Sequence, residues 1–236
     1  MISLFEQSDS SREDTVVVTS DAASRALSVT VVEQDFVEKV YEKISSWDDL
    51  FFGPTLQRGR LEAIRRLPIR PGQKVLEVGI GTGINAVLYP KNCVVTGIDF
   101  SAAMLKKAGR RIAGHGVKNV ELMQMDAADM KFEDESFDIV YAPYVISVVP
   151  DPVKVAREMH RVCRVGGYMI VLNHFRSQNP LMAWFERILS PLTVWIGFKA
   201  DVDLPAFLAQ TGLEPVSIEK VNILRMWSLV TFRKTA

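Results

Sequence analysis

Cysteine and histidine are scarce in this sequence. It contains two cysteines, Cys93 and Cys163, and three histidines among 236 residues. Neither cysteine belongs to a CxxC motif or a Cys/His cluster, so the sequence predicts no metal site and no disulfide framework. We expect two buried thiols in a reducing compartment.

An excess of one charge is also lacking, because 28 basic side chains balance 28 acidic ones. Domains that bind nucleic acid usually carry a basic footprint. The balance therefore argues against nucleic acid as a partner, although it leaves room for a local basic patch.

No uncharged apolar run reaches the roughly 20 residues that a membrane-spanning helix requires. The longest apolar region is interrupted by Glu186, Arg187 and Pro191. The first residues are rich in Ser and Asp and lack the basic and apolar regions of a signal peptide. We therefore expect a soluble cytoplasmic protein.

Hydrophobic residues make up 48% of the chain, which is enough for one large α/β domain. Residues 1–28 predict a flexible tail. From 29 to 44 apolar side chains recur every four positions (Val32, Phe36, Val40, Ile44), which indicates an amphipathic helix. A second helix is predicted over 55–67, and residues 29–70 together predict an N-terminal helical lid.

Strands and helices alternate over residues 71–236. Strands are predicted at 74–78, 94–98, 120–125, 137–142 and 168–173, and helices from the glycine turn to about 88, at 102–113 and at 152–164. A cap insertion (175–200), a helix ending at Gly212 and two antiparallel strands (214–220 and 223–232) follow. Helix starts are marked by Ser101, Asp151 with Pro152, and Asp203. This alternation predicts an α/β fold with a doubly wound, mainly parallel sheet.

A hydrophobic strand runs directly into three alternating glycines, Gly79, Gly81 and Gly83. Glycines allow a tight turn and a close approach of a ligand to the backbone. The amides at the following helix start suit negatively charged groups. The spacing G-x-G-x-G differs from the G-x-G-x-x-G of dinucleotide enzymes, and an acid, Glu77, precedes it by two residues.

Acidic side chains also follow the next two predicted strands. Asp99 ends the second strand, where a carboxylate could accept two ribose hydroxyls of either an adenine dinucleotide or S-adenosylmethionine. Asp126 follows the third strand, where it could accept the exocyclic amine of adenine, and this favours S-adenosylmethionine. The strand 137–141 closes the same crevice.

These segments, from about Val75 to Asn173, resemble the class I S-adenosylmethionine-dependent methyltransferases. The resemblance implies a Rossmann-like, seven-stranded sheet with S-adenosylmethionine as cofactor. It implies that the three glycines line the methionine part of the cofactor and that Asp99 binds its ribose. The further cofactor-binding residues that we carry over are Glu77, Phe100, Ser101, Met104, Asp126, Ala127 and Tyr141.

A narrower resemblance runs from about Phe36 to Phe175. It rests on the segments 47–53, Gly59-Arg60, 144–152, 161–164 and 173–175. These look like the bacterial soluble-type phosphatidylethanolamine N-methyltransferases. The resemblance implies a phospholipid acceptor, and the aromatic segment 180–199 with helix 29–44 would then contact the inner membrane face transiently.

An acceptor amine must lose a proton before it can attack a methyl group, because a free alkylamine has a pKa of about 10. The candidate proton acceptors are Tyr144, Tyr41 and His174, of which Tyr144 has the best position, just beyond the fourth strand. Aromatic rings around the site could stabilise a quaternary ammonium product.

Alternative functions stay open on the sequence alone. A methyltransferase of another small apolar acceptor, such as a quinone precursor, would share every cofactor residue. A non-catalytic module could use the same pocket to bind the cofactor without turnover. A nicotinamide dehydrogenase is disfavoured by the glycine spacing.

Overall fold

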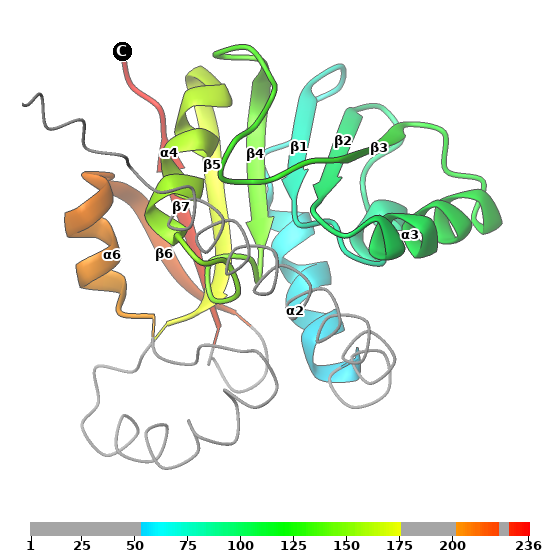
Figure 1. The fold of residues 1–236 in the computed structure, drawn as a ribbon, viewed down its shortest axis with the longest axis horizontal. Coiled ribbons are helices and arrows are strands. Elements are labelled where there is room, and N and C mark those ends of the chain that lie inside the picture. The colour runs from blue at the N-terminus through cyan, green and yellow to red at the C-terminus, as the bar shows by residue number, and fades with distance from the viewer. Residues whose placement is uncertain (1–52, 176–201, 222–226) are drawn as a thin grey trace, which may run out of the picture. The chain divides into compact units, whose positions relative to one another are not determined.

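The computed structural model describes residues 53–175, 202–221 and 227–236, and in it seven strands form one sheet. The strands lie in the order β3-β2-β1-β4-β5-β7-β6 (Figure 1). Their bounds are β1 Lys74–Val78, β2 Val94–Asp99, β3 Val120–Gln124, β4 Phe137–Pro143, β5 Cys163–His174, β6 Pro215–Val221 and β7 Trp227–Arg233. Strands β1 to β5 pair in parallel, and β7 is antiparallel to both of its neighbours. The predicted doubly wound, mainly parallel sheet is confirmed.

The direction of winding reverses at β1. The chain first adds β2 and β3 on one side of β1, and then returns to add β4 on the other side. In such sheets ligands bind beyond the carboxyl ends of the strands, at the point of reversal. The glycine turn leaves β1 at this edge, and the segment that begins with Tyr144 leaves β4 there.

Helices cover both faces of the sheet. They are α2 (Gly53–Arg66), α3 (Ala102–Gly114), α4 (Pro152–Val162) and α6 (Leu204–Thr211), with a 3₁₀ turn, η2, at Asn85–Val87. Side chains alternate along a strand, so Val75 and Leu76 of β1 point to opposite faces. Leu76 belongs to the core that includes α4 and α6, and Val75 to the core that includes α2.

Helix α2 is part of the domain core, because Ala63 and Ile64 near its end, and Leu67 just after it, are buried with residues of the sheet. This part of the predicted lid therefore packs on the sheet itself. The predicted tail (1–28), the predicted helix 29–44 and most of the predicted cap insertion lie outside the described residues. No helix in the described part of the chain is long and apolar enough to cross a membrane.

The predicted helix starts are confirmed, because the side chains of Ser101, Asp151 and Asp203 each accept a backbone N–H from the first turn. The short helix expected after the glycine turn is wrong in extent, since only the single turn η2 forms there.

The predicted end of α4 at Arg164 is also wrong. The helix ends at Val162, and Cys163 already pairs with Phe137 in the sheet. A Cβ atom on Gly167 would lie 2.7 Å from the carbonyl oxygen of Asp138. This glycine therefore allows β5 to approach β4 closely.

Candidate functional site

The glycine turn after β1 adopts a backbone that side chains disfavour. Gly79, Gly81 and Gly83 have φ angles of +69°, +55° and +73°. A Cβ atom would lie 2.5 Å from the Val145 side chain at Gly79 and 2.9 Å from the Ala108 Cβ at Gly83. At Gly81 it would meet no described atom within 4 Å. The turn is thus packed at both ends and open in its middle.

The carboxylate of Asp99 is bound to the same turn. Its Oδ2 accepts the Gly81 amide at 2.8 Å and its Oδ1 accepts the Ser101 amide at 2.9 Å. Burial raises the pKa of Asp99, and the two amide hydrogen bonds oppose this rise. Each carboxylate oxygen has a second lone pair, so the group can still accept hydroxyl donors from a ligand.

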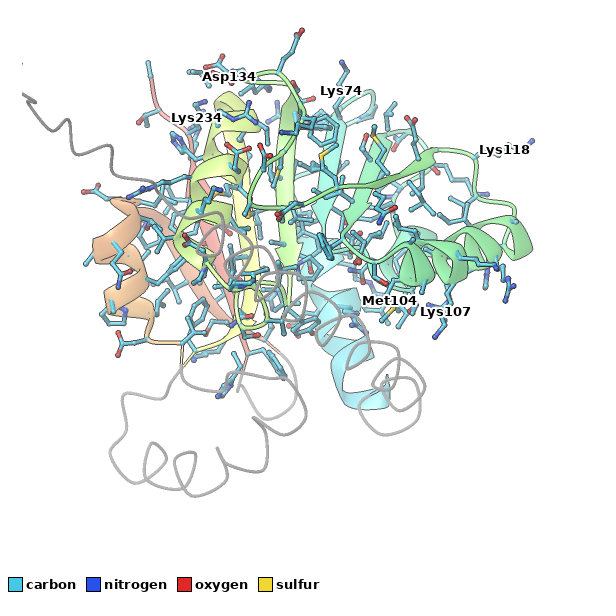
Figure 2. All side chains as sticks on the ribbon, viewed as in Figure 1. Lys74, Met104, Lys107, Lys118, Asp134 and Lys234 are labelled. Atoms are coloured by element: carbon cyan, nitrogen blue, oxygen red, sulfur yellow. The ribbon has the colours of Figure 1, made fainter. Side chains whose placement is uncertain are left out.

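Phe100, Ser101 and Met104 lie beside Asp99, at the start of α3. The Phe100 ring is 47% exposed, whereas Met104 is buried. The Ser101 hydroxyl caps the helix by accepting the Met104 amide. Figure 2 shows Met104 near the edge of the sheet opposite to Lys74, which begins β1. The predicted cofactor residues after β2 therefore lie at the carboxyl edge of the sheet.

Asp126 follows β3 at this edge. The amide of Met125, just before it, donates to the backbone oxygen of Asp99 at 3.0 Å, which ties the ends of β2 and β3 together. The exposed Asp126 side chain accepts the Ala128 amide, and Ala127 is half-buried in the same turn. The two acids predicted to bind the nucleoside thus follow neighbouring, hydrogen-bonded strands.

Glu77 lies in a buried polar cluster on the face of β1 that carries Val75. Its two carboxylate oxygens accept Asn85 Nδ2 and the Tyr89 hydroxyl, both at 2.7 Å. Burial raises the pKa of Glu77 to about 7. Within the described residues, Asn85 Oδ1 and the Tyr141 hydroxyl are buried without a hydrogen-bond partner. Asn85 and Tyr89 were not predicted as part of the site, because nothing local in the sequence marks them.

Three aromatic side chains gather where β4 and β5 end and β7 begins. We call these residues, Tyr144, His174 and Trp227, the acceptor side of the site. Tyr144 and Trp227 meet edge to face with ring centroids 4.8 Å apart, and His174 meets Trp227 at 5.7 Å. Tyr144 has a φ of +62°, which is strained for a bulky residue, and its amide donates to the Leu172 carbonyl oxygen.

Burial raises the pKa of Tyr144 to about 12. Its hydroxyl therefore stays protonated near neutral pH and acts as a neutral hydrogen-bonding group. Of the other two predicted proton acceptors, His174 is buried beside Trp227, and Tyr41 lies outside the described residues. Trp227 was missed at the sequence level because the antiparallel return of β7 brings it here.

The loop after Tyr144 is held by a buried polar pair. The Ser147 hydroxyl donates to Asn173 Oδ1 at 3.1 Å, and Asn173 Nδ2 donates to the His174 carbonyl oxygen at 2.7 Å. Both Ser147 and Asn173 are fully buried. These bonds join the loop after β4 to the end of β5, and so fix the backbone around Tyr144 and His174.

Comparison with known proteins identifies the family. The family described as "Methyltransferase domain" matches residues 76–171. The chain is 37% identical over 205 residues to a phosphatidylethanolamine N-methyltransferase from Cereibacter sphaeroides, which covers 86% of this chain and 100% of that protein. The chain belongs to the S-adenosylmethionine-dependent methyltransferases.

The methyltransferase is also similar to proteins named for another acceptor. It is 35% identical over 166 residues to a demethylmenaquinone methyltransferase from Bacillus cytotoxicus, covering 66% of this chain and 68% of that protein. Its fold is shared with an S-adenosylmethionine-dependent methyltransferase structure from Aquifex aeolicus, at a TM-score of 0.60, 18% identity, and coverage of 81% and 97% of the two chains.

The site fits the cofactor of this family. No described atom lies within 4 Å of a Cβ placed on Gly81, so a ligand could approach the backbone there. The Asp99 carboxylate can still accept hydrogen bonds from ribose hydroxyls. The described part of the methyltransferase contains no group of three or more His, Cys, Asp or Glu side chains that could hold a metal ion. The cofactor roles of the individual residues stay predictions.

Proposed function

We propose that the methyltransferase acts on the amine of phosphatidylethanolamine and of its mono- and dimethylated forms, towards phosphatidylcholine. The observation that carries this proposal is the 37% identity to the phosphatidylethanolamine N-methyltransferase of Cereibacter sphaeroides over that protein's whole length. The match to the demethylmenaquinone methyltransferase of Bacillus cytotoxicus is 35% identical but spans 68% of that protein.

The chemistry of the acceptor side supports an amine substrate. S-adenosylmethionine supplies an activated methyl group on a positively charged sulfur, so the protein has mainly to align the nucleophile. The neutral Tyr144 hydroxyl and the His174 ring are the candidate hydrogen-bond acceptors for an amine N–H. The rings of Tyr144 and Trp227 offer cation–π attraction to the methylated ammonium that forms.

A phospholipid acceptor also requires that the enzyme meet a lipid surface. We propose that it binds the inner membrane face transiently, through helix 29–44 and the segment 180–199. Both segments lie outside the described residues, so this part of the proposal rests on their aromatic and amphipathic sequence pattern.

A quinone precursor is the second candidate acceptor. It is favoured by the demethylmenaquinone methyltransferases among the relatives, which reach 35% identity. Both acceptors would use the same cofactor residues, so only the acceptor side distinguishes them.

The test is methyl transfer by the purified protein from labelled S-adenosylmethionine to vesicles containing phosphatidylethanolamine, with demethylmenaquinol in detergent as the competing acceptor. We expect mass spectrometry to show mono-, di- and trimethylated ethanolamine lipids, and Asp99→Asn to reduce all three. Methylation of the quinol alone would overturn the proposal in favour of the second candidate. Tight binding of S-adenosylhomocysteine without any methylated product would instead favour a non-catalytic module.

A further inference from the structure

Arg60 places a cation next to the acceptor side. Its guanidinium carbon lies 5.0 Å from the centroid of the Tyr144 ring, in a cation–π contact. The side chain is half-buried, and within the described part of the chain it forms no ion pair and no hydrogen bond. A guanidinium has five N–H donors, and leaving them unpaired in a partly buried place is costly.

Glu77 is a nearby carboxyl, but it does not form an ion pair with Arg60 in the described part of the chain. The charge of Arg60 acts to lower the pKa values of Glu77, Tyr141 and Tyr144, so it lies near all three. However, Arg60 and Glu77 form no ion pair within the described part of the chain, and burial keeps the Glu77 pKa at about 7. Among the described residues, Arg60 therefore has no fixed carboxylate partner.

Another arginine on the same helix shows the usual surface arrangement. Arg66 forms ion pairs with Glu62 and with Glu219, the latter at 2.6 Å. Arg65 is exposed to solvent, where water can satisfy it. Arg60 differs from both, because it is half-buried, stacked on an aromatic ring and directed to the acceptor side.

We propose that Arg60 and Tyr144 form an anion subsite that binds the phosphodiester of the acceptor lipid. The proposal rests on the proposed function and adds a specificity-determining residue to it. Arginine suits this task because its planar fork matches two phosphate oxygens at once, and because it is always charged. A phosphate held at Arg60 would place the ethanolamine nitrogen, two carbons away from the phosphate oxygen, among the rings of the acceptor side.

Arg60 could instead bind the α-carboxylate of the cofactor, which is also an anion. The location of Arg60 favours the lipid. Its ring contact is with Tyr144, just after β4, whereas the glycine turn and Asp99 of the cofactor half follow β1 and β2. If Arg60 binds the lipid phosphate, replacing it should weaken lipid binding. If it binds the cofactor carboxylate, replacing it should weaken cofactor binding.

The test compares Arg60→Gln with Arg65→Gln, an exposed control on the same helix. We measure the KM for phosphatidylethanolamine in mixed micelles, and the Kd of S-adenosylhomocysteine by calorimetry. Arg60→Gln should raise the lipid KM at least about tenfold, the effect of losing one charge-assisted hydrogen-bonded pair. Arg60→Gln should leave the Kd of S-adenosylhomocysteine within about twofold of the wild-type value. Arg60→Lys should partly restore the lipid KM. Arg65→Gln should change neither the KM nor the Kd.

A second measurement needs no variant, and so does not depend on the folding of one. Soluble glycerophosphoethanolamine should inhibit the wild-type enzyme competitively with the lipid, at concentrations where ethanolamine, which has no phosphate, does not. Equal inhibition by the two compounds would overturn the subsite.

The remaining outcomes separate the subsite from the proposed function. If the wild type methylates phosphatidylethanolamine and Arg60→Gln keeps its lipid KM, the subsite alone is wrong. If Arg60→Gln weakens S-adenosylhomocysteine binding about tenfold instead, the anion is the cofactor carboxylate and the proposal is overturned. If the wild type methylates no phosphatidylethanolamine at all, the proposed function fails and the subsite fails with it.

Discussion

Among single residues, Glu77 lies in an environment that is unusual for an acidic side chain. It is fully buried, and its pKa is raised from 4.5 to about 7, mainly by desolvation. The hydrogen bonds from Tyr89 and Asn85 and the charge of Arg60 lower the pKa, whereas the charge of Asp99 raises it. In the ligand-free protein the folded state therefore holds a proton that an unfolded chain releases at about pH 4.5. Stability is linked to pH through this difference.

Replacing Glu77 tests this linkage. Between pH 4.5 and 7 the folded carboxyl binds the proton more tightly than the unfolded one, so its contribution to stability falls as pH rises through 7. Glu77→Gln removes the titration. We expect the free energy of unfolding of the wild type, relative to Glu77→Gln, to drop by about 2–3 kcal/mol from pH 5 to pH 8.

Chemical denaturation of both proteins at the two pH values measures this difference. The matched control is Glu121→Gln, which changes an exposed carboxyl on the edge strand β3. If the stabilities of Glu77→Gln and the wild type change in parallel with pH, the carboxyl of Glu77 is charged in the folded protein and the prediction is wrong.

At the scale of elements, two glycines test whether the cofactor approaches the turn between β1 and η2. Gly81 lies in this turn, and Gly72 lies outside it. Gly81 and Gly72 share a positive φ, of +55° and +80°, and an added Cβ at either one meets no described atom within 4 Å. They differ in place, since Gly81 lies at the carboxyl edge of the sheet and Gly72 precedes β1 at the opposite edge.

We expect Gly81→Ala and Gly72→Ala to lower stability by a similar amount, about 1 kcal/mol, because both force a side chain into a left-handed backbone. Only Gly81→Ala should weaken binding of S-adenosylhomocysteine, by about tenfold or more, since the alanine methyl group would occupy the space next to the turn where we expect the ligand to bind. Denaturation and calorimetry measure the two effects separately. Equal S-adenosylhomocysteine affinity in both variants would show that the cofactor does not approach Gly81.

The elements that the sequence predicted well are those with local signals. The apolar run before the glycines defines β1, and a capping side chain marks the start of α3, α4 and α6. The end of α4 was misplaced because the pairing of Cys163 with Phe137 joins segments that are distant in sequence.

The same reason explains the missed site residues. Asn85 and Tyr89 were missed because their bonds to Glu77 depend on how the segment after the glycine turn folds back over β1. The meeting of Arg60 and Trp227 at Tyr144 joins α2, β4 and β7. Only the packed sheet brings such residues together, so no window of the sequence could reveal the contact.

At the scale of the whole described domain, the sheet brings two ligand sides to one edge. The glycine turn, Asp99 and Asp126 follow β1, β2 and β3, whereas Tyr144, His174 and Trp227 lie at the ends of β4, β5 and β7. The reversal of winding at β1 places the boundary between the two sides at the crevice between β1 and β4.

Cofactor binding should therefore stabilise the domain as a unit. S-adenosylhomocysteine at 100 times its Kd stabilises a folded state by about 2.7 kcal/mol. For a domain of this size we expect the midpoint of thermal unfolding to rise by roughly 5–10 °C. Asp99→Asn should show a much smaller rise at the same ligand concentration, relative to its own ligand-free midpoint.

Differential scanning fluorimetry with and without S-adenosylhomocysteine measures these shifts. Asp129→Asn is the control, since Asp129 is exposed and pairs only with Lys131 in the part of the chain described. A full shift in Asp99→Asn would contradict the assignment of this carboxylate to the cofactor.

The carboxylate of Asp99 already bonds the Gly81 and Ser101 amides in the absence of any ligand. Attempts to re-engineer the enzyme for a different nucleoside would therefore have to leave this residue in place. A substitution that removes the Asp99 carboxylate would release the glycine turn and the start of α3, so the site would lose its shape before it gained a new selectivity. The freedom to evolve towards other cofactors lies instead with exposed neighbours such as Phe100 and Asp126. Within the described residues, the Asp126 side chain bonds only the Ala128 amide of its own turn.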